Sequence, residues 1–99
     1  MKKLLLTLLL LSPAGYAHTP LFDCYDNLDD TITCEGGFSD GGSAEGVDIR
    51  ILDARGKVMQ QGELDATGSI TFDKPEGEYT VVFAADSQHS VIILGDDIY

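Results

Sequence analysis

The stretch GVDIRILDARGKVMQQGELDATGSITFDKPEGEYTVVF, residues 46–83, determines the fold class of this 99-residue chain. Val47, Ile49 and Ile51 alternate with polar residues, which is the period of two that a half-buried β-strand shows. Turn sequences rich in Asp, Gly and Pro interrupt this pattern about every eight to twelve residues. Such spacing is typical of all-β sandwiches and barrels.

About seven strands are expected in one small all-β domain, and no segment after the first residues shows the apolar spacing of a helix. The strands are expected at residues 21–25, 31–34, 47–53, 57–64, 69–72, 79–85 and 89–94, with a bulge at Gly62. The expected core consists of Val47, Ile49, Ile51, Val58, Leu64, Ile70, Phe72, Tyr79, Val81, Phe83, Val91 and Ile93, with Leu21 or Phe22 added by the first hairpin.

The two cysteines lie in a predicted hairpin within residues 18–34. A three-residue turn at 28–30 would place Cys24 directly opposite Cys34, at a separation that a disulfide accepts. A disulfide is therefore expected, and a thiolate metal site is the alternative. The Gly- and Ser-rich residues 35–46 are expected to form a loop before the core strands of residues 47–94.

The first 17 residues have the three parts of a secretory signal peptide. Two lysines precede a leucine-rich run that is too short to span a bilayer, and small residues follow at Gly15 and Ala17. Cleavage after Ala17 would make His18 the first residue of a periplasmic β-sandwich domain at 18–99, with no stable membrane insertion. Cleavage after Ala14 or Gly15 is the alternative.

The charge of the chain excludes some classes of partner. Six Lys and Arg residues stand against 17 Asp and Glu residues, a net charge of −11. Removal of residues 1–17 takes away two lysines and no acid, so the mature charge becomes −13. This charge opposes binding to nucleic acid or to anionic lipid, and it attracts cations.

Residues 46–83 resemble the carboxypeptidase-regulatory-like, transthyretin-like group of Ig-like β-sandwich domains. The running pattern of that group is two D-x-x-G turns followed by P-x-G-x-Y-x-V. The matching positions here are Asp53, Gly56, Asp65, Gly68, Phe72, Pro75, Gly77, Tyr79 and Val81. The resemblance covers about half of the mature chain and implies a fold rather than a function.

The segments HTPLFDCYDNLDDTITCEGGFSDGGSAEGV and HSVII resemble small exported bacterial proteins associated with nickel and cobalt uptake systems of the energy-coupling-factor type. The resemblance implies an accessory protein that binds the metal ion and meets a component of a membrane importer. Leu28 and Asp30 stand where the family has glycine, which argues against a tight turn with positive φ.

His18 and His89 are the two histidines of the chain and the expected metal ligands. A mature N-terminal His18 offers its α-amine and its imidazole, which can close one chelate ring on a cation. An N-terminal segment that runs beside the last strand would add His89, and Asp23 could complete the set. Three nitrogens suit Ni, Co, Cu or Zn.

Other chemistry is weakly indicated. DNLDD at 26–30 lacks the Gly and the Glu of an EF-hand loop, so a polar turn is favoured over a calcium site. No G-x-S-x-G occurs, and the chain ends in DDIY rather than in the Y-R-G-S of transthyretin-like hydrolases, so no enzyme is expected. A periplasmic metal-binding accessory protein is the first hypothesis; a periplasmic copper carrier and an interaction module without metal are the alternatives.

Overall fold

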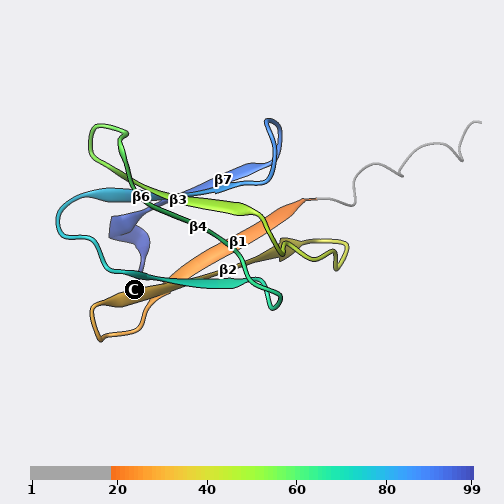
Figure 1. Ribbon diagram of the computed structural model, residues 1–99, viewed down its shortest axis with the longest axis horizontal. Coiled ribbons are helices and arrows are strands. Elements are labelled where there is room, and N and C mark those ends of the chain that lie inside the picture. Colours follow the sequence, from red (N-terminus) through yellow and green to blue (C-terminus); the bar gives the residue numbers. More distant parts are fainter. Residues whose placement is uncertain (1–18) are drawn as a thin grey trace, which may run out of the picture.

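The computed structural model describes residues 19–99, so the predicted signal peptide at 1–17 and His18 lie outside the described residues. Within residues 19–99, seven strands are followed by one short 3-10 helix (Figure 1). The elements are β1 (Pro20–Asp26), β2 (Thr31–Phe38), β3 (Asp48–Asp53), β4 (Val58–Glu63), β5 (Ser69–Asp73), β6 (Tyr79–Ala84), β7 (Ser90–Leu94) and η3 (Gly95–Asp97).

The strands form two antiparallel sheets stacked face to face (Figure 1). One sheet has the order β1-β2-β5 and the other has the order β4-β3-β6-β7. The chain changes sheet between β2 and β3, between β4 and β5, and between β5 and β6. The edge strands β4 and β5 are in contact, and so are the edge strands β1 and β7. The predicted all-β sandwich of seven strands is confirmed.

The core lies between the two sheets, because alternate residues of each strand point inward. Its buried members are Cys24, Ile32, Cys34, Ala44, Ile49, Ile51, Leu64, Phe72, Tyr79, Val81 and Phe83. Phe83 is its largest fully buried side chain, and the centroid of its ring lies 5.1 Å from that of Phe22 and 6.0 Å from that of Phe38. Of the two alternatives expected from the first hairpin, Phe22 packs against the core, whereas Leu21 is 53% exposed.

The predicted loop at residues 35–46 begins later than expected, because β2 continues to Phe38. Gly36 lies opposite Phe22 in this extension, and a Cβ atom on Gly36 would stand 2.8 Å from the ring of Phe83. The glycine thus gives room to a core aromatic ring instead of breaking the strand.

Two expectations for β4 were wrong. Val58 is 44% exposed, because the register shifts between Ile51 and Leu52 and pairs Val58 with Leu52 on the outer face. The irregularity is therefore near Met59, whereas Gly62 pairs regularly with Ile49. A Cβ atom on Gly62 would stand 2.6 Å from Cδ1 of Ile70, so this glycine too serves core packing.

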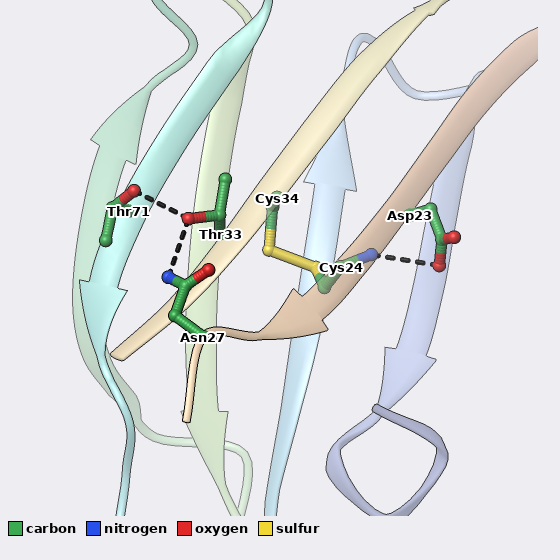
Figure 2. The surroundings of a disulfide bond; sticks show 6 residues. All are labelled: Asp23, Cys24, Asn27, Thr33, Cys34 and Thr71. Carbon is green, nitrogen blue, oxygen red and sulfur yellow. Dashed lines mark hydrogen bonds between the residues drawn. A yellow bond between two sulfur atoms is a disulfide. The ribbon is translucent and has the colours of Figure 1, made fainter. Parts of the chain in front are cut away.

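The β1–β2 hairpin carries the predicted disulfide. Cys24 pairs with Cys34 in register, with their Cα atoms 4.0 Å apart, and the bond joins the two strands (Figure 2). Leu28 and Asp30 in the turn have positive φ of 63° and 69°. The argument from missing glycines against a turn with positive φ was therefore wrong.

Hydrogen bonds hold that turn in place. Asn27 N donates to Thr31 O at 3.0 Å, and Asn27 Nδ2 donates to the hydroxyls of Thr31 and Thr33. Lys74, in the connection after β5, donates its amide N to Asp30 O at 2.8 Å. Together these bonds hold a left-handed backbone that carries no glycine.

Candidate metal-binding site

The β6–β7 hairpin positions His89. Ala85 N donates to His89 O at 3.1 Å, and the side chain of Asp86 organises the residues between them. Asp86 Oδ1 accepts hydrogen bonds from the backbone N of Gln88 at 2.7 Å and of His89 at 2.8 Å. His89 is thus held at the last position of a short turn, immediately before β7.

Asp86 also contacts the imidazole ring of His89. Nδ1 lies 2.9 Å from both carboxylate oxygens of Asp86, and the two side chains are 40% and 57% exposed for His89 and Asp86. The hydrogen bond from Gln88 N, followed by the interaction with His89, lowers the pKa of Asp86. An ionised Asp86 only accepts hydrogen bonds, so Nδ1 carries the proton and Nε2 of a neutral ring keeps its lone pair.

A carboxylate on one ring nitrogen is the usual partner of a metal-binding histidine, because it sets the tautomer and makes the other nitrogen a stronger donor. The sequence prediction missed Asp86. A usable signal was present, since D-S-Q-H repeats the spacing of the D-x-x-G turns at Asp53 and Asp65 with a histidine in the fourth place.

His18, the other predicted nitrogen ligand, precedes the described part of the chain. The next residue, Thr19, is anchored beside the end of β2: its O accepts a hydrogen bond from Ser39 N at 2.9 Å, and its N donates to Ser39 Oγ at 3.2 Å. The start of β1 and the β6–β7 loop lie at the same end of the sandwich (Figure 1). β1 and β7 also touch each other.

Asp23, the third predicted ligand, lies on the exposed face of β1. Its Oδ1 accepts a hydrogen bond from Cys24 N at 2.9 Å, and its side chain points away from the disulfide (Figure 2). Three residues of extended strand place Asp23 about 10 Å from Pro20. The carboxylate in contact with His89 belongs to Asp86. The role of Asp23 as a metal ligand stays a prediction.

Within residues 19–99, no group of three or more His, Cys, Asp or Glu side chains is arranged to hold a metal ion. Both cysteines are in the disulfide, which leaves no thiolate for a metal among these residues. In the turn at 26–30, Asp26 pairs with Lys74 at 2.7 Å and Asp29 accepts from the N and hydroxyl of Thr31. These carboxylates stabilise the turn.

Comparisons with family models, with curated proteins and with solved structures returned no match to the chain. No helix among residues 19–99 has the length and apolar character needed to cross a membrane.

Proposed function

We propose that this chain is an exported, periplasmic accessory protein that binds a divalent transition metal through His18 and His89 and presents it to a membrane importer. Ni²⁺ or Co²⁺ is the proposed cargo, with copper as the alternative. No catalytic activity is proposed. The observation that carries the proposal is the contact between Asp86 and Nδ1 of His89, which prepares Nε2 as a ligand.

The position of the N-terminus adds to this support. His18 directly precedes Thr19, which is fixed by two hydrogen bonds at the end of the sandwich that also carries the β6–β7 loop (Figure 1). After cleavage at Ala17, the α-amine and imidazole of His18 would supply two nitrogens and His89 a third. A site with few ligands suits a carrier, because it can pass its ion on.

The charge of the chain favours the same function. The net charge of −11 attracts cations and raises their concentration near the surface. Asp86 keeps its negative charge at neutral pH, since its hydrogen bonds lower its pKa. A positive ion bound at Nε2 of His89 is therefore stabilised by the negative charge already in place on Asp86.

Calorimetric titration of the exported protein with Ni²⁺, Co²⁺ and Cu²⁺ tests the proposal. Asp86→Asn should weaken binding by about 10- to 100-fold, which is the usual effect of removing the partner of a metal-binding histidine. Asp65→Asn is the matched control, because it changes an aspartate that also accepts two backbone hydrogen bonds in a turn but has no histidine beside it.

Two further variants separate the two ends of the site. His89→Ala should abolish the contribution of the third nitrogen, and one alanine added ahead of His18 should remove the α-amine. Unchanged affinity in both variants would contradict the proposal. Mass spectrometry of the exported protein checks that His18 is its first residue, and loss of binding in Asp65→Asn would assign the effect to the fold instead.

A further inference from the structure

The outer face of the four-stranded sheet carries an exposed apolar patch on its β6–β7 side. Val82 pairs directly with Ile92, and Thr80 pairs with both Leu52 and Leu94. Ile92 is 63% exposed and Leu94 is 56% exposed, while Leu52 and Val82 are half-buried beside them. We call Leu52, Val82, Ile92 and Leu94 the outer patch. Clustered exposed apolar side chains on one sheet face mark an interaction surface.

An acidic hollow adjoins the outer patch where β7 ends. Leu94 and Thr80 line it together with the carboxylates of Asp53, Glu78 and Asp96, and its lining has no basic side chain. Asp53 is fully ionised at neutral pH, because hydrogen bonds from the backbone N of Lys57 and Arg55 lower its pKa. The surface thus joins an apolar area to a concentration of negative charge.

We propose that the outer patch and the acidic hollow form a docking surface for a second, different protein whose contact segment carries apolar side chains beside Lys or Arg. The apolar side chains would cover Ile92 and Leu94, and the cation would enter the hollow between Glu78 and Asp96. Complementary charge selects such a partner. A second copy of this chain is disfavoured, since each copy carries a net charge of −11.

The acidic hollow lies away from the proposed metal site. β7 begins directly after His89 and ends at Leu94, so five residues of extended strand, about 17 Å, separate His89 from the hollow. Arg50, which also faces outward on β3 beside Val82, is paired with Asp48 at 2.6 Å and does not neutralise the hollow. Docking and metal binding can therefore be tested one at a time.

A photo-crosslinking amino acid placed at Ile92, in the cells that make the protein, tests the inference. The matched control carries the same group at Thr71, an exposed residue on the outer face of the three-stranded sheet. We expect the Ile92 variant to crosslink to one other protein, at a segment that mass spectrometry identifies as apolar with an adjacent Lys or Arg. The Thr71 variant should give no such product.

Charge reversal in the acidic hollow is the second test of the proposed docking surface. Glu78→Lys with Asp96→Lys should reduce the crosslinked product about fivefold or more, which corresponds to about 1 kcal/mol of lost attraction. Glu45→Lys, an exposed change in the loop after β2, should leave it unchanged. A product made of two copies of this chain, no product beyond that of Thr71, or a yield unaffected by the two reversals would each overturn the inference. Thermal melting confirms that each variant is folded.

Discussion

Three turns of this sandwich are organised by an aspartate in the same way, and one of them differs from the other two in its fourth residue. In Asp53–Gly56, Asp65–Gly68 and Asp86–His89, the first aspartate accepts hydrogen bonds from backbone N–H groups that follow it. The first two turns end in glycines with φ of 85° and 79°, a left-handed conformation that favours glycine. The third ends in a histidine outside that conformation.

The difference shows that the aspartate organises the turn, while the fourth position is available for other uses. In the turn at 65–68, the carboxylate of Asp65 also accepts a hydrogen bond from the hydroxyl of Thr67. In the turn at 86–89, the carboxylate of Asp86 is hydrogen-bonded to the imidazole of His89 instead. The same kind of turn therefore connects β4 to β5, which lie in different sheets, and orients a potential ligand in the β6–β7 hairpin. Single substitutions in the three turns test these separate roles of the aspartate and of the fourth residue.

The largest effect is expected at Gly68. Alanine there would adopt an unfavourable φ, and its Cβ atom would stand 2.6 Å from the backbone O of Gly36. Gly68→Ala should lower the free energy of unfolding by about 2–3 kcal/mol, measured by urea titration. Gly56→Ala, with similar φ and no atom within 4 Å, should cost about 1 kcal/mol. Equal losses would show that the contact with Gly36 is unimportant.

A smaller loss of stability, to which the three turn aspartates contribute together, is expected at acidic pH. Hydrogen bonds lower the pKa values of Asp53, Asp65 and Asp86 in the folded protein, whereas an unfolded chain has aspartates near the ordinary value of about 3.9. The unfolded state therefore binds protons at higher pH. The stability due to these groups is fully present above about pH 4 and is lost as the pH falls through the folded values.

The variant Asp65→Asn tests the predicted direction of this pH dependence. The variant should show a shallower fall in the free energy of unfolding between about pH 5 and pH 2 than the parent protein, because one depressed pKa is removed. Denaturant titrations at a series of pH values provide the measurement. A slope in Asp65→Asn equal to that of the parent protein would contradict the assignment.

The sequence predicted the strands and most of the core because alternation and turn residues are local signals. It failed where backbone geometry depends on distant contacts. The bulge near Met59 reverses the side on which Val58 lies, and Leu28 and Asp30 adopt positive φ because a disulfide hairpin and Lys74 hold the turn. Neither the bulge nor the positive φ values can be predicted from the sequence of the strand or of the turn itself.

The candidate site was predictable only in part. His89 was identified because the chain has two histidines, whereas no carboxylate partner of its ring was predicted. Asp23 or a water was expected only to complete the set of metal ligands. The hydrogen bond of Nδ1 depends on how Asp86 folds back over the turn, which residue type alone does not determine. Comparison with the two D-x-x-G turns provides that information, because all three place a carboxylate over the fourth residue.

The smallest effect on stability is expected from His89→Gly, which gives the third turn the same fourth residue as the other two. Asp86 would keep its hydrogen bonds to the backbone N of Gln88 and of residue 89, so the hairpin should persist. Because φ at this position is not positive, glycine offers no conformational gain and should cost about 0.5–1 kcal/mol in urea titration, while Ni²⁺ affinity falls. His89→Asn is the control for the loss of the ring without added flexibility. If His89→Gly instead lost as much stability as Gly68→Ala, the imidazole would be a structural part of the turn, and its contact with Asp86 would no longer argue for a ligand.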